Sequence, residues 1–320
     1  MKAGERLAPR SVHLSGQQVQ FGWDRDRAPL VTVPSGSTLT LHVPEASGGQ
    51  VNKGSTYATI ADLDFERVNP TCGPIYVEGA TTGSALQVEI LNIRTGTWGW
   101  TAQIPGFGLL ADQFPDPWLR IWEFEEQQTR LTDGIRVRLH PMCGVIGVVP
   151  AEHGVLSVVP PRRVGGNMDI KQLGEGATLY LPVAVPGALL GIGDPHAAQG
   201  DGEVCGSAIE TSAEVVVRVT VRKDLSIESP EFDVPGALER TSAAKAGYHA
   251  TSGIAPDLIT AARQSVERMI VYLGSRYRLE AQDAYALCSV AVDLRISEVV
   301  DAPNWVVSAF LPLDLFDPRL

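Results

Sequence analysis

Four side chains that can bind a metal ion form two pairs, one on each side of an apolar run at residues 177–185. Asn167 and Asp169 precede the run, and Asp194 and His196 follow it. In extended backbone, residues two apart point to the same side, so each pair can present both donors on one face. Side by side, the pairs would offer several oxygen atoms and one imidazole nitrogen. That donor set is typical of zinc or of a harder cation such as calcium.

Glycine surrounds both pairs, and the second pair leads into a loop with two further carboxylates. Gly165-Gly166 precedes the first pair, and Gly200 and Gly202 follow the second. Glycine lets the backbone bend and approach a ligand closely. Asp201 and Glu203 lie two residues apart in this loop. One of them could act as general base toward a metal-bound water, or both could orient the metal ligands through hydrogen bonds.

The segments that must position these residues are mostly strands. Val31–Val33 and Thr38–Val43 flank a Pro-Ser-Gly turn and predict a hairpin. Alternation in residues 86–91 places Leu86, Val88 and Ile90 on one face, and the valines of 215–221 alternate with polar residues in the same way. Strands are predicted at residues 17–23, 31–33, 38–43, 75–78, 86–91, 135–140, 177–185, 215–222 and 305–310.

Two helices are predicted near the end of the chain, at residues 256–273 and 280–291, from apolar residues at helical spacing. Residues 98–122, with four tryptophans, are predicted to be irregular and to cover a pocket, a subunit partner or a sheet edge. The predicted fold is mainly β and sandwich-like, with a small C-terminal helical patch. We predict a β-rich part at 1–150, and a second at 151–320 that carries the helices and the metal site; one continuous domain is the alternative.

Composition excludes several classes of partner. The formal net charge of −11 at pH 7 argues against nucleic acid and against an anionic membrane. No uninterrupted apolar run is long enough to span a bilayer, and the start of the chain has no signal-peptide pattern. The four cysteines form no C-x-x-C pair, which is typical of reduced core residues in a cytoplasmic protein. We therefore expect a cytoplasmic protein without nucleic-acid or membrane partners.

Several ordered motifs resemble the acetamidase/formamidase family, from about residue 20 to the end of the chain. The motifs are Asp62-Leu63-Asp64 with Asn69-Pro70, Gly73 to Ala80, Gly144-Val145-Ile146-Gly147, Gly165 to Asp169, Leu179 to Val183, Pro186 to Leu190, Gly193 to Glu203, Tyr248-His249, Ala284 to Val290 and Asp293-Leu294-Arg295. The resemblance implies a β-rich fold and the hydrolysis of short aliphatic amides, such as formamide and acetamide, to carboxylate and ammonia. It also implies a bound metal, because structures of the family have been seen with one.

Eight side chains in these motifs are predicted to form the site. They are the metal ligands Asp169, Asp194 and His196, the catalytic carboxylates Glu203 and Glu78, and the substrate-binding residues Asn167, Gln199 and His249. Alternative roles are structural: Glu78 could end a solvated strand, Gln199 could only close its loop, and His249 could have a structural role alone. The predicted cofactor is a divalent metal, zinc first and calcium second.

Other amidase chemistries fit less well. The chain has no G-x-S-x-G elbow and no H-E-x-x-H motif. Cys205, two residues after Glu203, could serve as a nitrilase-type nucleophile, but that chemistry needs an α/β sandwich. Metal-assisted hydrolysis remains, in which a cation polarises the amide carbonyl and lowers the pKa of bound water.

The alternative function is a non-catalytic binding or regulatory protein for small amides. The tryptophan-rich segment predicts a homodimer or a higher homo-oligomer.

Overall fold

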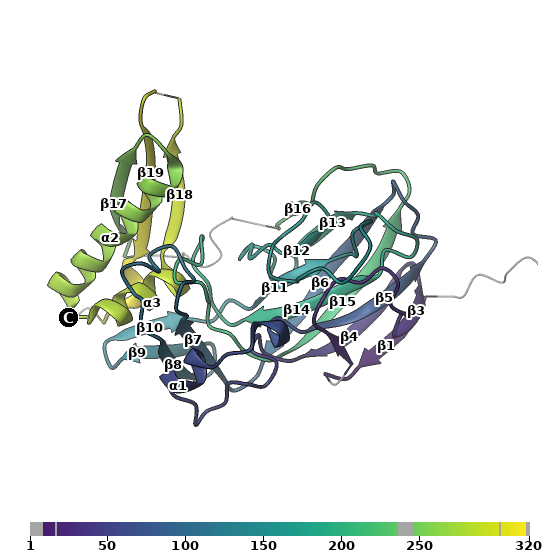
Figure 1. The fold of residues 1–320 in the computed structure, drawn as a ribbon, viewed down its shortest axis with the longest axis horizontal. Coiled ribbons are helices and arrows are strands. Elements are labelled where there is room, and N and C mark those ends of the chain that lie inside the picture. Colours follow the sequence, from purple (N-terminus) through teal and green to yellow (C-terminus); the bar gives the residue numbers. More distant parts are fainter. Residues whose placement is uncertain (1–8, 17, 236–245, 301, 318–320) are drawn as a thin grey trace, which may run out of the picture.

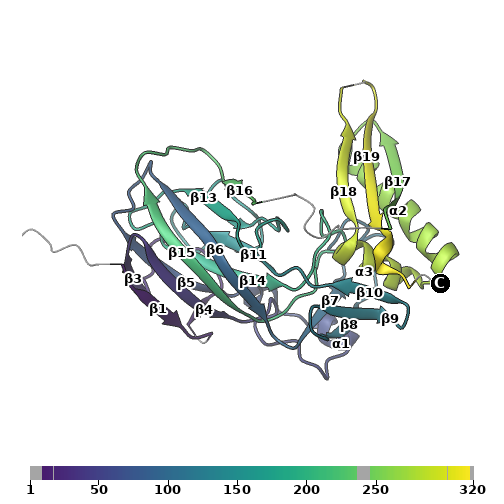
Figure 2. The same cartoon turned by 180° about the vertical axis from the view of Figure 1, so that it is seen from behind.

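Two β-sheets face each other across an apolar core, and a smaller part built from strands and helices lies beside them (Figure 1). The computed structural model describes residues 9–16, 18–235, 246–300 and 302–317. Both views show the sheets together at one end of the molecule and the late helices at the other (Figure 2). The mainly β expectation, with helices near the end of the chain, is confirmed.

The first sheet has six strands, with β15 and β6 in its middle. Residues predicted to share a face are nearly or fully buried: Val215, Val217 and Val219 in β15, and Leu86, Val88 and Ile90 in β6. The order across the sheet is β1 (Ser11–Leu14), β4 (Ser37–Val43), β15 (Ala213–Arg222), β6 (Ala85–Thr95), β13 (Thr178–Pro182) and β16 (Glu231–Asp233).

The second sheet carries β14 near its centre, and every residue of β14 is buried. The order is β12 (Gly165–Asn167), β11 (Met142–Gly147), β14 (Leu190–His196), β5 (Thr71–Glu78) and β2 (Val19–Gln20), with β3 (Val31–Pro34) also paired to β5. Each sheet combines strands from both sides of residue 150. The two halves of the chain therefore fold together in the sandwich.

The predicted hairpin at residues 31–43 is wrong, although both of its strands exist. β3 pairs in parallel with β5, whereas β4 pairs with β1 and β15 in the other sheet. Val33 and Leu39 are both fully buried in the core between the sheets. The turn at Gly36 (φ +90°) thus carries the chain across the core from one sheet to the other. Alternation predicts which side chains are buried, but it does not identify the neighbouring strand.

The tryptophan-rich segment is also more regular than predicted. β7 (Trp98–Gln103) and β8 (Trp118–Glu123) form an antiparallel pair, joined by the long loop 104–117. Five of the six residues of β7 are buried, so the strand lacks the alternation by which a half-buried strand is found. The strand predicted at 17–23 shrinks to β2, and residue 17 lies outside the described residues.

A second apolar core fills the smaller part. The helix at residues 258–277 packs on the three-stranded sheet of the late strands, and its buried residues include Val266, Met269 and Leu273. Both predicted helices are confirmed, because they overlap the helices at 258–277 and 281–291. The remaining elements are α1 (Tyr57–Ala61), η1 (Phe65–Arg67), β9 (Gln128–Thr132), β10 (Ile135–Arg138), β17 (Tyr248–Ala255), α2 (Leu258–Tyr277), α3 (Ala281–Ala291), β18 (Asp293–Glu298), β19 (Trp305–Pro312) and η2 (Leu313–Leu315). Among the described residues, no helix combines the length and the apolar character needed to span a bilayer.

Candidate functional site

The two predicted donor pairs lie on either side of β11, since Asn167 ends β12 and Asp169 follows it, whereas Asp194 and His196 belong to β14. Val145 of β11 lies opposite Asn167 of β12 on one edge and opposite Gly193 of β14 on the other. The pairs are therefore separated by one strand instead of lying next to each other. Their side chains meet across β11, where the residue between them is Gly144.

Gly144 provides the space in which the carboxylates gather. A Cβ atom at this position would lie 2.4 Å from Asp169 Oδ1, 2.9 Å from Asp194 Oδ2 and 2.9 Å from His196 Cε1. Real Cβ atoms essentially never come closer than 3.0 Å to such neighbours. Glycine is thus the residue that leaves room for the cluster.

Four carboxylates surround the imidazole of His196. Its Nε2 atom is 3.1 Å from Glu210 Oε2, 3.2 Å from Asp194 Oδ1 and 4.0 Å from Glu203 Oε1. Asp169 belongs to the same group, since its ligand atom lies within 4.8 Å of those of His196 and Glu203. Asp169, Asp194 and Glu203 have φ values of +50°, +54° and +42°. Such left-handed backbone is uncommon outside glycine and is often found at functional sites.

Several buried atoms of the cluster lack a hydrogen-bond partner. They are Asp169 Oδ1, Asp194 Oδ1, His196 Nε2 and Glu210 Oε2. Buried polar atoms in native proteins nearly always have a partner. The ligand atoms of Asp194, His196 and Glu210 lie within 4.8 Å of one another, and Asp169 shares a second such group with His196 and Glu203. The four unpartnered atoms are three carboxylate oxygens and one imidazole nitrogen. The donor set fits a divalent cation.

Gln199 orients the imidazole. Its Nε2 donates to the Asp169 carbonyl oxygen at 2.6 Å, which leaves its Oε1 facing His196 Nδ1 at 2.8 Å. Nδ1 must then carry the proton and donate it to Gln199. In the neutral ring, the lone pair of Nε2 points at the carboxylates, as in histidines that bind metals. Gln199 was predicted to bind substrate; its polar atoms instead support His196.

Burial and mutual repulsion raise the pKa values of Asp169, Glu203 and Glu210, so that these carboxyl groups bind protons more readily. Burial raises the pKa of Asp169 to about 7 and that of Glu210 to about 8, and the charge of Asp194 adds to both shifts. Burial also raises the pKa of Glu203 well above its ordinary value. Burial lowers the pKa of His196, but the neighbouring carboxylates of Glu210 and Asp194 outweigh it and raise this pKa. A divalent cation would compensate the same negative charge in place of protons.

Two residues of the site were missed from the sequence. Glu210 forms isolated β-bridges with Trp100 and His196, and its Oε1 accepts from Ala208 N at 2.8 Å. Its one local signal is that a carboxylate directly follows the apolar Ala208-Ile209. Asn69 lies within a family motif, and its Nδ2 donates to Asp194 Oδ2 at 3.2 Å.

The cluster forms the floor of a pocket of about 360 Å³. Asn167 lines this pocket beside Asp169 and Glu203, and its Oδ1 accepts a hydrogen bond from Asn69 at 3.3 Å. Trp100 lines it too, so part of the tryptophan-rich segment does cover a pocket. The other walls are mainly apolar, with Ala46, Leu63, Phe65, Val68, Ile104, Phe107, Leu109, Val159 and Val204.

Two predicted site residues lie elsewhere. Glu78 is the last residue of β5, and Thr71 at the other end of β5 pairs with Gly193. At about 3.3 Å per residue, Glu78 is roughly 23 Å along the strand from the cluster. His249 stacks on Tyr272 in the smaller part, with ring centroids 3.5 Å apart. Neither residue lines the pocket. The prediction relied on motifs, and a motif can mark a turn or a packing contact as readily as a site.

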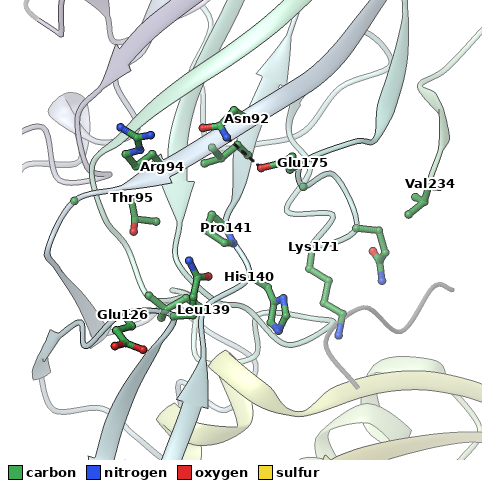
Figure 3. Close-up of a pocket in the computed structure, with 15 residues that line it drawn as sticks. Asn92, Arg94, Thr95, Glu126, Leu139, His140, Pro141, Lys171, Glu175 and Val234 are labelled. Carbon is green, nitrogen blue, oxygen red and sulfur yellow. Dashed lines mark hydrogen bonds between the residues drawn. The ribbon is translucent and has the colours of Figure 1, made fainter. Parts of the chain in front are cut away.

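A larger pocket of about 460 Å³ is lined in part by Lys171 and Glu175 (Figure 3). It is lined by charges of both signs, including Arg94, Lys171 and Glu175, and Asn92 donates to Glu175 at 3.3 Å. Within the described residues, both groups of three or more metal-capable side chains belong to the cluster around His196. The pocket above that cluster is therefore the candidate functional site.

Several known proteins resemble this chain over most of its length. A formamidase from Methylophilus methylotrophus is 28% identical, over 94% of this chain and 90% of that protein. The structure of a gamma lactamase from Delftia acidovorans superimposes with a TM-score of 0.86 at 27% identity, over 94% of this chain and 90% of its own. An acetamidase from Bacillus halodurans is 33% identical, with a TM-score of 0.66 over 94% of this chain and 97% of its own.

The model of the acetamidase/formamidase family matches residues 9–157 and 153–318, which together span nearly the whole chain. This match confirms the resemblance seen in the motifs around Gly144, Asp169 and Asp194. The chain belongs to the acetamidase/formamidase family.

Proposed function

We propose that this protein is a metal-dependent amidohydrolase that cleaves linear amides to carboxylate and ammonia. The observation that carries the proposal is the buried carboxylate and imidazole cluster, with unpartnered ligand atoms, at the floor of the pocket. Family membership supports the class of reaction, since the relatives include proteins named formamidase and acetamidase.

Asp194, His196 and Glu210, whose ligand atoms lie within 4.8 Å of one another, would hold the cation. Asp169, which is grouped with His196 and Glu203, would be its third carboxylate. Three carboxylates with one imidazole suit zinc and leave calcium as the second candidate. A divalent cation in this position would polarise the amide carbonyl and lower the pKa of water. Gln199 would keep the Nε2 lone pair of His196 directed at the site.

Glu203 is the carboxylate best placed to move a proton. It lines the pocket, and its side chain is 17% exposed, against 5% or less for Asp194 and Glu210. It would accept a proton from the attacking water and return it to the departing nitrogen, because an amide nitrogen leaves poorly without a proton. The water oxygen joins the carbonyl carbon, the C–N bond breaks, and nitrogen departs as ammonia.

The competing hypotheses have less support. Cys205 is buried, it does not line the pocket, and burial raises the pKa of its thiol to about 11. A nucleophilic cysteine needs accessible thiolate instead. A non-catalytic binder of small amides would have no use for a pocket-facing carboxylate such as Glu203 beside the cation ligands.

We further propose a cytoplasmic homo-oligomer. The four cysteines are free and buried, as is common in reducing compartments. Exposed apolar side chains lie on α2, β17 and β18, where Val271 is 71%, Ile254 58% and Ile296 63% exposed. Association of these elements with a second copy would cover this apolar surface. Light scattering coupled to gel filtration would measure the number of subunits, and a monomer would contradict the proposal.

Ammonia release from formamide and acetamide tests the proposed function. The protein would be assayed as purified, after chelation, and after each of zinc and calcium is restored. We expect activity to disappear on chelation and to return with one of the two ions. Full activity in metal-free protein would refute the role of the cation, and no ammonia from any amide with metal-loaded protein would refute amide hydrolysis.

A further inference from the structure

The pocket is much larger than the smallest amides. Its volume is about 360 Å³. About twelve water molecules occupy that volume in the liquid, at ~30 Å³ each. Acetamide would fill only the volume of about two or three water molecules. Pockets of ~300 Å³ and above usually hold ligands of drug-like size. An amide group at the floor would thus leave most of this pocket unfilled.

The polar side chains that line this pocket are the four carboxylates of the cluster, Asn69, Asn167 and Ser207, whose Oγ donates to Ala102 O. The walls carry Leu63, Phe65 and Val68 on one segment, and Ile104 and Phe107 on the loop between β7 and β8. In the part of the chain that the structure describes, no lysine or arginine lines it. A substrate with an anionic substituent would face four carboxylates without a basic side chain to balance it. The walls therefore favour a neutral, apolar substituent.

Two aromatic rings lie at the outer part of the pocket. Phe65 and Phe107 are 45% and 41% exposed, and their rings meet edge to face with centroids 6.3 Å apart. Gly206 (φ +89°) allows this position of Phe107, since a Cβ there would lie 2.5 Å from Phe107 Cδ1. The adjoining Leu109 N donates to Val204 O at 2.8 Å. Phe107 is thereby held against the loop that carries Glu203.

The orientation of a substrate follows from these groups. A primary amide has two N–H donors, which the carboxylates of the floor can accept, including Glu203. An alkyl group on nitrogen would instead be forced among carboxylates, at the cost of their hydrogen bonds. The acyl substituent is then directed toward Phe65 and Phe107, where it would cover apolar surface that is exposed without it.

We propose that the preferred substrates are neutral primary amides with a large apolar acyl group, of about the size of a hexyl chain or a phenyl ring. This inference rests on the proposed amide hydrolysis, and it makes formamide and acetamide poor substrates of the same site. Water cleaves the C–N bond in each case, so that the products are the corresponding carboxylate and ammonia.

A series of amides tests this substrate class. We would measure kcat/KM of the metal-loaded protein for formamide, acetamide, butanamide, hexanamide, benzamide and N-hexylacetamide. Each buried methylene should raise kcat/KM about fourfold, so hexanamide should exceed acetamide by on the order of 10²-fold. A steady fall from formamide to hexanamide would overturn the inference and leave the proposed function intact. Faster cleavage of N-hexylacetamide than of hexanamide would overturn the acyl assignment, and no turnover of any amide would overturn both proposals.

Two variants and a control test whether Phe65 and Phe107 cause the preference for a large acyl group. Phe107→Ala and Phe65→Ala should each lower the ratio of kcat/KM for hexanamide to that for acetamide by about tenfold. Tyr57→Ala is the matched control, because Tyr57 is an aromatic residue on α1 that is 67% exposed and does not line the pocket. In Tyr57→Ala, the ratio of kcat/KM for hexanamide to that for acetamide should match the ratio in the parent protein. An unchanged ratio in both phenylalanine variants, with melting temperatures showing folded protein, would overturn the inference.

Discussion

Replacing Gly144 by alanine would add one carbon atom at the centre of the cluster without removing any of its side chains. The backbone of Gly144 is not in the left-handed region, so alanine meets no conformational penalty there. The effect of Gly144→Ala would be purely steric, because the new Cβ would lie 2.4 Å from Asp169 Oδ1 and 2.9 Å from Asp194 Oδ2.

The size of the effect follows from these distances. Ordinary van der Waals contact at a Cβ begins at 3.4 Å, so the Asp169 carboxylate must move by 3.4 − 2.4 = 1.0 Å. A displacement of about 1 Å in a catalytic constellation can cost about 10²-fold in rate. Overpacking a buried position typically lowers the free energy of unfolding by about 1–3 kcal/mol. Gly144→Ala should thus remain folded, with turnover at saturating amide reduced about 10²-fold.

The assay compares turnover, metal content and urea unfolding of the variant with those of the parent protein. Gly274→Ala is the control, since the nearest atom to its Cβ would be Leu279 O at 3.4 Å, outside α2. Alanine is favoured over glycine in helices by about 1 kcal/mol, so this control should be active and at least as stable. Unchanged turnover and metal content in Gly144→Ala would refute the reasoning, because the cluster would then not need the space that glycine provides.

Three further variants test other parts of the structure. Glu203→Gln keeps size but removes basicity, so turnover at saturating amide should fall by about 10²–10⁴-fold with metal content unchanged; near-normal turnover would exclude Glu203 as the base. Gln199→Met removes the hydrogen bond to His196 Nδ1 and the one to Asp169 O that fixes the amide, and metal affinity, measured by competition with a chelator, should fall about 10–100-fold; equal affinity would contradict the orienting role. Burial lowers the pKa of His140 from its ordinary 6.5 to about 4. As pH falls through this range the unfolded chain takes up a proton that folded His140 does not, and stability decreases. Urea unfolding at pH 7 and pH 5 should show a smaller decrease for His140→Gln, and an equal decrease would disprove this account.

Local patterns were enough to find much of the fold and part of the candidate site. The alternating valines of β15 and the helical spacing in α2 predicted which side chains are buried, since these periods follow from backbone geometry alone. Asp169, Asp194, His196 and Glu203 could be predicted as one group because each stands in a glycine-rich loop or motif. The structure brings Asp169, Asp194 and Glu203 together around His196.

Only the tertiary structure decided which other residues complete the site. Glu210 reaches His196 through long-range bridges, and its own neighbours in the chain carry no motif. Gly144 matters because β11 passes between the two donor pairs, a fact of strand order that alternation does not encode. Glu78 belongs to a motif as clear as the others, yet the length of β5 carries it away from the cluster. The spacing of residues along a chain determines which face each side chain takes, whereas the pairing of distant strands determines which faces meet.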